Sequence, residues 1–430
     1  KTGEYDKAVV DCNKAIRLDP NCASAHLNRG VAYDAKGERD RAIADCSAAI
    51  RIDPEDAAAY YIRGHARDNK GEFDEAIVDF TQAIRLDPGF GDAYVSRGVA
   101  YDNRGDFDRA TADHTEAIRL DSKCVLAYLN RGASHVHKGE FDEAIADFTE
   151  TIRLDPKNAL AHCNRGEVYV SIGEFDKTIS DCSTAIRLDP KLAVAYCSRG
   201  YAYDDSGEVD KAIADYSESI RLCPKFAEAY LNRGTAFVRR DEYDKAIADF
   251  TEAIRLDPEF GDAYYNRGIA YDTERKFGKA IADFTQAIRL DPGFGDAYYY
   301  RGVSYDRQEE FDRSIADFTA AIRINPKDPR AYDGRGDAYS DKGEYDQAIG
   351  DYTQAIRLDP GFGDAYLSRG RVYGWMGDDD KAIADHSMVI QLDPERGEAY
   401  GNRGWSYRRK GEYSKAEADF AECRKLGYPC

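Results

Sequence analysis

One proline recurs at a fixed interval of 34 residues along this chain, and the period constrains the fold more than any other feature. Near-copies of one segment, AIADFTQAIRLDP at residues 280–292, lead up to each proline. A period of this length is typical of a solenoid, in which every repeat packs mainly against its neighbours. The recurring prolines are Pro20, Pro54, Pro88, Pro156, Pro190, Pro224, Pro258, Pro292, Pro326, Pro360 and Pro394, and Ser122 fills the one missing place.

The repeated segment has the apolar spacing of an amphipathic helix. Apolar residues occur at i, i+1, i+4, i+7 and i+8 from Ala280 to Ile288, which is a helical stripe and not a strand alternation. Pro292 has no amide hydrogen, so we expect the helix to stop there. The preceding segment, residues 262–273, has an apolar stripe of its own. Two such short helices cover each other only in part, so the next pair must bury the rest.

Small residues occur where the two helices of a repeat would approach closely, and aromatic residues surround that contact. In the repeat that starts at residue 261 these residues are Gly268, Ala280, Ala287, Tyr264, Tyr271 and Phe284. The pattern resembles the tetratricopeptide repeat over essentially the whole chain. The resemblance implies an all-α fold, a right-handed α-solenoid or superhelix of helix-turn-helix repeats, whose first helices line the concave surface.

The period divides the chain into the second half of a truncated repeat, residues 1–22, and twelve full repeats. We interpret the missing first helix and the missing methionine as a fragment that starts inside an array. Glu417 and Arg424 replace isoleucines of the other copies, so we expect the last repeat to cap the array. The full repeats are 23–56, 57–90, 91–124, 125–158, 159–192, 193–226, 227–260, 261–294, 295–328, 329–362, 363–396 and 397–430, and "position" below counts residues within one of them.

A glycine joins the two helices in most repeats, where a residue that tolerates positive φ suits a tight turn. Asp241, Arg275 and Glu309 replace this glycine in three consecutive repeats. We therefore expect a locally looser or differently curved array in this region.

Composition narrows the possible partners. The formal charge of −20 argues against a nucleic-acid partner and favours basic or polar proteins and peptides. No apolar run is long enough to span a membrane. The ten cysteines are used irregularly, which favours reduced thiols and a cytoplasmic protein, although any signal peptide would precede Lys1.

An arginine at position 7 and an aspartate at position 23 occur in every full repeat. A residue that is present in every copy serves the fold before it serves a binding site. We therefore expect this arginine and this aspartate to pair within or between repeats. In the repeat that starts at residue 261 they are Arg267 and Asp283.

Candidate binding residues come from the concave positions that the resemblance implies. Asparagines recur at position 6, at Asn28, Asn130, Asn164, Asn232, Asn266 and Asn402. They resemble the asparagine ladder in the repeat arm of O-linked N-acetylglucosamine transferase, which implies a grip on the backbone of an extended peptide. Other residues interrupt the ladder, at Ile62, Ser96, Ser198, Tyr300, Gly334 and Ser368.

Aspartates and tyrosines complete the candidate groove. The aspartates at position 12 are Asp34, Asp68, Asp102, Asp204, Asp272 and Asp306, and the tyrosines at position 5 are Tyr61, Tyr265 and Tyr299. This lining would prefer a segment that carries Lys or Arg; alternatively, the aspartates are solvated or interact with helix dipoles. Basic residues and two tryptophans, Trp375 and Trp405, appear near the C-terminus and suggest a different preference there, for an acidic group.

No arrangement of Ser, His, Cys and Asp predicts a catalytic or metal site, so we expect no enzymatic activity and no cofactor. The sequence predicts a protein-interaction scaffold that holds an extended peptide or partner helix in its concave groove. Two alternatives stay open: an accessory arm of a larger enzyme whose catalytic domain precedes residue 1, and a self-associating array that docks through its uncovered N-terminal helix.

Overall fold

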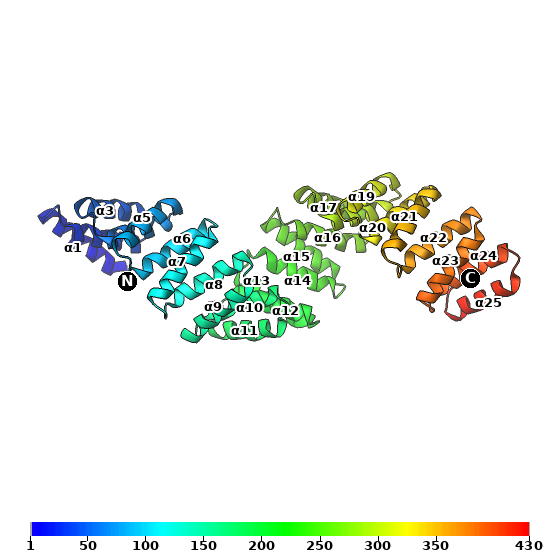
Figure 1. Cartoon of the computed structure of the whole chain (residues 1–430), viewed down its shortest axis with the longest axis horizontal. Helices are drawn as coiled ribbons and strands as arrows, with labels where there is room; N and C mark the ends of the chain where they lie inside the picture. Colours follow the sequence, from blue (N-terminus) through cyan, green and yellow to red (C-terminus); the bar gives the residue numbers. More distant parts are fainter. Residues whose placement is uncertain (1, 430) are drawn as a thin grey trace. The chain divides into compact units, whose positions relative to one another are not determined.

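The computed structural model describes residues 2–429, and these residues form helices and short connections without any strand (Figure 1). The helices group into two compact units that divide between Pro224 and Lys225. The first unit holds α1 (Thr2–Leu18), α2 (Ala23–Ala35), α3 (Arg39–Ile52), α4 (Ala57–Asp68), α5 (Phe73–Leu86), α6 (Gly91–Asn103), α7 (Phe107–Leu120), α8 (Val125–Lys138), α9 (Phe141–Leu154), α10 (Ala159–Ser171), α11 (Phe175–Leu188), α12 (Ala193–Asp205) and α13 (Val209–Leu222).

The second unit is built in the same way. It holds α14 (Ala227–Val238), α15 (Tyr243–Leu256), α16 (Gly261–Thr273), α17 (Phe277–Leu290), α18 (Gly295–Asp306), α19 (Phe311–Ile324), α20 (Pro329–Asp341), α21 (Tyr345–Leu358), α22 (Gly363–Met376), α23 (Asp379–Leu392), α24 (Gly397–Arg409) and α25 (Tyr413–Lys425). From α2 onward the even-numbered helices are the first helices of the repeats and the odd-numbered ones the second helices. The all-α solenoid expected from the period is thereby confirmed.

Each second helix ends where the sequence predicts. Asp291 follows α17 with extended backbone, φ −129° and ψ 98°, because the residue before a proline is disfavoured in the helical region. Its carboxylate accepts a hydrogen bond from the Gly293 amide at 2.8 Å, which fixes the turn into the next repeat. The Asp-Pro pair therefore terminates one helix and directs the chain into the following one.

The core of each repeat depends on a close approach between its two helices. Phe284, Ala280 and Ala287 are fully buried. A Cβ atom added to Gly268 would lie 2.7 Å from Cε1 of Phe284, which is closer than van der Waals contact. The glycine thus makes room for the aromatic ring that fills the space between the helices.

Consecutive repeats approach each other unevenly. Within each unit of the described chain, every first helix contacts the first helix of the next repeat, whereas consecutive second helices do not contact each other. Neighbouring repeats are therefore closest along their first helices and separate along their second helices. This arrangement places the first helices on the inner, concave side of each unit.

The turn between the two helices keeps its conformation where glycine is replaced. Asp241, Arg275 and Glu309 have φ values of 58°, 59° and 62°, in the same left-handed region as the turn glycines of other repeats. The three substitutions are accommodated by strained backbone and not by a different turn.

The cysteines follow the expected pattern with one exception. Eight of them are free thiols, and Cys46, Cys163, Cys182 and Cys197 are buried as small core residues. Cys423 is disulfide-bonded, so the expectation of reduced thiols is wrong at that residue.

Candidate functional site

The recurring arginine and aspartate form a structural pair, as predicted. Arg267 of α16 donates from Nε and Nη2 to both carboxylate oxygens of Asp283 in α17, at 2.7 and 2.8 Å. The same two-point pairing occurs in all twelve full repeats. These side chains hold the scaffold together, which accounts for their presence in every repeat.

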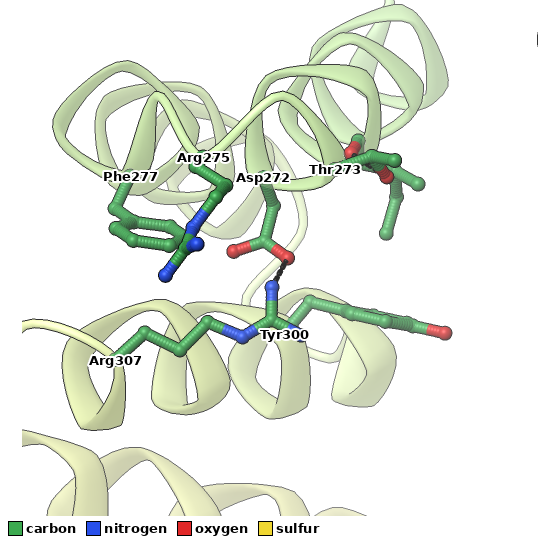
Figure 2. Close-up of a pocket in the computed structure, with 7 residues that line it drawn as sticks. Asp272, Thr273, Arg275, Phe277, Tyr300 and Arg307 are labelled. Carbon is green, nitrogen blue, oxygen red and sulfur yellow. Dashed lines mark hydrogen bonds and ion pairs between the residues drawn. The ribbon is translucent and has the colours of Figure 1, made fainter. Parts of the chain in front are cut away.

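The surface hollows of the described residues include three that lie between successive first helices. The largest of the three, about 660 Å³, lies between α16 and α18 and is shown in Figure 2. A second, about 300 Å³, lies between α8 and α10, and a third, about 410 Å³, lies between α22 and α24. Each of the three is lined by residues at positions 9, 12 and 13 of one first helix and at positions 6 and 13 of the next first helix. The hollow is therefore a consequence of the repeat.

An ion pair crosses the hollow between α16 and α18. Figure 2 shows the carboxylate of Asp272 facing the guanidinium of Arg307 across the gap, while the Arg275 side chain lies beside the Phe277 ring. Asp272 accepts hydrogen bonds from Nη1 of Arg307 and from Oγ of Ser304, the latter at 2.8 Å. The carboxylate is buried and links the two first helices, so this member of the predicted groove has partners within the protein.

The residue at position 12 decides the chemistry of each hollow. It is Asp272 between α16 and α18, Val136 between α8 and α10, and Gly374 between α22 and α24. At this register the three hollows therefore carry a carboxylate that is paired within the protein, an apolar side chain, and no side chain, respectively. Repeats of one shape thus present different surfaces to a partner.

The predicted asparagines all lie on first helices, but their amides are not equivalent. Asn164 and Asn402 line hollows, and Nδ2 of Asn402 is buried without a hydrogen-bond acceptor. Asn266 donates to the backbone oxygen of Asp262 on its own helix at 2.8 Å. Asn28 is exposed, and Asn130 and Asn232 are half-buried.

The position-12 aspartates divide into engaged and open carboxylates. Asp102 accepts hydrogen bonds from Ser134 at 2.7 Å and lies 3.2 Å from Nε2 of His114. One carboxylate oxygen of Asp34 lies 2.8 Å from Nδ1 of His65, and the other oxygen is buried without a hydrogen-bond donor. Asp204, like Asp272, is buried.

Two further aspartates show the effect of burial on the carboxyl group. One oxygen of Asp68 and one of Asp306 are buried without a hydrogen-bond donor. Burial raises the pKa of Asp68 above its usual value. Burial, with the charges of Asp341 and Asp337 adding to it, raises the pKa of Asp306 to about 6.

The three predicted tyrosines pack against neighbouring aromatic rings. Tyr61 lies 4.8 Å from Phe90, measured between ring centroids, and Tyr265 lies 4.7 Å from Phe294. The Tyr299 ring carries the guanidinium of Arg330 at 5.2 Å from its centroid, and burial raises the pKa of Tyr299 to about 12. Two of these contacts, of Tyr61 and Tyr265, are with the last residue of the same repeat, and the contact of Tyr299 with Arg330 reaches the next repeat.

The sequence reasoning missed a cluster of carboxylates on α20. Asp337 accepts a hydrogen bond from the hydroxyl of the buried Tyr352 at 2.7 Å. Burial and the charges of Asp337 and Asp364 raise the pKa of Asp333 to about 8, against the opposing charge of Arg371. The signal was present in the sequence, because residues four apart share one face of a helix.

The described residues contain neither a metal-binding cluster nor a helix that could span a membrane. No group of His, Cys, Asp and Glu within residues 2–429 is arranged to hold a metal ion. No helix of this part of the chain is both long and apolar enough to cross a membrane.

Family models of the tetratricopeptide repeat match the chain almost from end to end. Models described as "Tetratricopeptide repeat" or "TPR repeat" match residues 231–293, 265–329, 1–37, 134–173, 202–241, 336–377, 23–56, 57–90, 91–124, 159–192 and 397–426. No curated protein sequence matches the chain.

Several solved structures are similar to this chain. The APC/C hetero-tetramer Cut9–Hcn1 has 17% sequence identity and a TM-score of 0.51, with 94% of this chain and 93% of that chain covered. A tetratricopeptide repeat protein from Parabacteroides merdae has 23% identity and a TM-score of 0.47, covering 55% of this chain and 93% of that one. MamA has 30% identity and a TM-score of 0.36, with 37% and 94% covered. The first of these similarities shows a shared fold.

Proposed function

Because the chain belongs to the tetratricopeptide repeat family, we propose that it is a protein-interaction scaffold whose first helices hold an extended, basic or polar segment of a partner protein. The observation that carries this proposal is the set of open carboxylates at position 12. Three of these carboxylates bury one oxygen that accepts no hydrogen bond. They are Asp34 and Asp68, which lie one repeat apart, and Asp306 in the second unit.

Burying an acceptor without a donor costs free energy, because the acceptor loses its hydrogen bonds to water and forms none within the protein. The ammonium of a lysine or the guanidinium of an arginine would supply the missing donor as a charge-assisted hydrogen bond. The net charge of −20 would also attract a basic segment from a distance. The asparagines at position 6 add amide donors and acceptors that suit the backbone of an extended peptide.

The proposal is tested by titrating the whole chain with an acetylated, amidated peptide of alternating glycine and lysine. The double variant Asp34→Asn with Asp68→Asn should bind this peptide about tenfold more weakly or worse, since charge-assisted hydrogen bonds are lost. The matched control is Asp142→Asn with Asp176→Asn, which removes the same charge from exposed positions at the start of α9 and α11.

Equal weakening by both double variants would show that only net charge attracts the peptide, and would overturn the proposed groove. A second set of substitutions tests the asparagines. Changing Asn130, Asn164, Asn232 and Asn266 together to Ala should weaken binding of both the lysine peptide and a glycine–glutamine peptide of the same length. An unchanged affinity for both peptides would show that these amides do not contribute to peptide binding.

A further inference from the structure

The two tryptophans of the chain lie in one hollow. Trp375 at position 13 of α22 and Trp405 at position 9 of α24 both line the hollow between these helices, whose volume is about 410 Å³. In the hollow between α8 and α10 the same two places are taken by His137 and Glu167. The indole rings therefore belong to this pair of repeats alone, and the repeat architecture does not require them.

Both rings are exposed to solvent and are held by neighbouring side chains. Trp375 is 59% and Trp405 46% exposed, whereas tryptophan is highly buried on average. The Trp375 ring lies 6.1 Å from that of Tyr345, and Trp405 packs edge-on against Phe420 at 5.4 Å, both measured between centroids. The guanidinium of Arg408 lies 5.3 Å from the Trp405 centroid. Rings that are fixed before a ligand arrives lose little conformational entropy on binding.

The charged groups of this hollow are paired within the protein. Arg409 donates from Nε to Asp379 at 2.8 Å, and Nη1 of Arg371 lies 3.5 Å from the carboxylate of Glu398. Burial, and after it the charges of nearby arginines, lower the pKa of His386 to about 4, so this imidazole is uncharged at neutral pH. The lining together with Asp379 therefore carries no net charge, and an uncharged ligand suits it.

Hydrogen-bonding groups of both kinds line the hollow beside the rings. Nε of Arg371 and Nδ2 of Asn402 are donors without an acceptor, and the Asn402 amide can turn toward a ligand because its terminal torsion is soft. The acceptors are the Asn402 amide oxygen and the carboxylate of Glu398, which accepts more than one hydrogen bond. This mixture matches hydroxyl groups, since each hydroxyl donates once and accepts twice.

A pyranose sugar combines the two surfaces that this lining requires. Its hydroxyls project around the edge of the ring, and when they are equatorial, as in glucose, the axial C–H bonds leave an apolar face on either side. The face of an aromatic ring carries partial negative charge and attracts these C–H groups. A hollow of about 410 Å³ also has the size of a small-molecule site. An uncharged ring with an apolar face and a polar edge thus fits both the tryptophans and the polar groups.

We propose that the hollow between α22 and α24 binds a gluco-configured pyranose of a neutral glycan. The C–H faces of the glycan stack on Trp375 and Trp405, and its hydroxyls exchange hydrogen bonds with Asn402 and Glu398. Sugar binding is separate from the recognition of a basic protein segment, so it goes beyond the function proposed above and does not depend on it.

Tryptophan fluorescence of the whole chain gives a direct assay, because both tryptophans lie in this hollow. Cellotriose should change the emission saturably, with a dissociation constant on the order of 1 mM or tighter. Sorbitol, which has the hydroxyls of glucose but no ring face, should bind about tenfold more weakly or worse. The acetylated, amidated peptide Pro-Pro-Pro represents the alternative ligand, a flat and uncharged protein segment, and should bind more weakly than cellotriose.

Substitutions in the hollow test the two kinds of contact by isothermal titration calorimetry. Trp375→Ala removes a stacking face and should weaken cellotriose binding about tenfold, whereas Trp375→Phe keeps an aromatic face and should weaken it less than about threefold. Asn402→Leu keeps the volume, removes the amide and should weaken binding about tenfold. Tyr413→Ala is the matched control, because it removes a 67% exposed ring at the start of α25, outside the hollow. This control should bind cellotriose like the native chain.

Two further probes identify the source of the sugar. They are methyl β-glucoside and an acetylated, amidated Gly-Ser-Gly peptide whose serine carries β-linked glucose. Tighter binding of the glycopeptide would assign the site to a glycosylated protein, and equal or weaker binding would assign it to a free oligosaccharide. Both outcomes support the site.

Equal binding of cellotriose and sorbitol, unchanged binding by Trp375→Ala, tighter binding of Pro-Pro-Pro than of cellotriose, or no saturation by cellotriose up to about 10 mM would each overturn the proposal. Thermal unfolding verifies that each variant is folded. The Asp34→Asn, Asp68→Asn double variant should bind cellotriose like the native chain, so failure of one proposal is distinguishable from failure of the other.

Discussion

Arg267 holds both carboxylate oxygens of Asp283 and, with its remaining terminal nitrogen, reaches the hydroxyl of Thr251 in the preceding repeat at 3.0 Å. One guanidinium therefore ties together α15, α16 and α17. The side chains of the pair are only 16% and 9% exposed. The same reach to a serine or threonine of the preceding second helix recurs along both units, so the arginine joins neighbouring repeats as well as the two helices of its own.

Replacing Arg267 by Lys should destabilise the array, because an ammonium cannot make two parallel hydrogen bonds to Asp283 and a third to Thr251. We expect a loss of about 2–4 kcal/mol in the free energy of unfolding, since a largely buried carboxylate is left without its partner. Thr251→Ala should cost only about 1 kcal/mol. Thermal unfolding, with hydrogen exchange of the α16 and α17 amides, measures both. Glu252→Gln, which breaks an exposed pair with Arg255 on α15, should cost less than about 1 kcal/mol.

Two glycines of one repeat should respond to alanine in opposite directions. A Cβ atom at Gly336 would lie 2.7 Å from Cε1 of Tyr352, whereas a Cβ atom at Gly350 would meet nothing within 4 Å. Gly336→Ala should therefore lower the free energy of unfolding by about 1–3 kcal/mol through overpacking. Gly350→Ala should raise it by about 1 kcal/mol, because alanine favours a helix interior. Denaturant titration of the two variants decides this, and a shift of the same sign for both would contradict the packing described here.

The strained turn residues predict a stabilising substitution. Glu309 has a φ of 62° at a place where Gly343, in the next repeat, has a φ of 83°. Glu309→Gly should stabilise the chain by about 0.5–1 kcal/mol, because glycine adopts the left-handed region without steric cost. The reciprocal control, Gly343→Ala, should cost about 1 kcal/mol. Differential scanning calorimetry of both variants would refute this account if Glu309→Gly lowered the melting temperature.

The buried carboxyl of Asp333 should make stability depend on pH. Its pKa in the folded chain is about 8, above the value of about 3.9 in an unfolded chain. The folded state therefore binds the proton more tightly, and stability falls as pH rises from about 4 to about 8, with no further loss from this group above that range. Asp333→Asn removes this dependence. The variant should exceed the native chain in stability by on the order of 2 kcal/mol near pH 8.

The advantage of Asp333→Asn should vanish as pH falls to about 4, where the native carboxyl is protonated in both states. Melting temperatures of the two proteins across this range provide the measurement. Asp346→Asn, at an exposed position in the first turn of α21, is the control and should show a pH-independent difference. A constant difference for Asp333→Asn as well would mean that the carboxyl is not protonated in the folded chain.

The buried thiols should resist alkylation. Burial raises the pKa of Cys46 and of Cys182 to about 12, so almost no thiolate forms at neutral pH. Iodoacetamide followed by mass spectrometry should label the half-buried Cys124 and Cys223 well before Cys46 and Cys182 in the native chain. In denaturant all four should react at similar rates, which separates the effect of burial from intrinsic reactivity.

Much of the scaffold could be predicted without coordinates. The proline period and the apolar stripe indicate two helices per repeat, and the Asp-Pro pair marks where the second helix ends, as Asp291 and Pro292 show. The pairing of Arg267 with Asp283 was also predictable, since both occur in every copy. A repeat pattern of this kind is local in sequence, and local spacing is sufficient to define a helix and its buried face.

The polar contacts of the candidate groove are much harder to predict, because they depend on distances between repeats. The sequence predicts position 12 as a groove position, but only the structure shows that Asp272 is held by Ser304 and Arg307 while one oxygen of Asp306 accepts no hydrogen bond. The ring contacts of Tyr61 with Phe90 and of Tyr265 with Phe294 likewise cannot be predicted from the sequence.

By itself the sequence determined the period, the helices, their ends and the residues that every repeat uses to hold its own two helices together. Tertiary structure alone decided which polar groups of one repeat meet those of the next, and therefore which acceptors and donors remain unpaired. The physical reason is that a hydrogen bond depends on separations of about 3 Å, and these are set by how closely consecutive first helices pack. Asp272, for example, meets Ser304 and Arg307 only because α16 and α18 pack side by side.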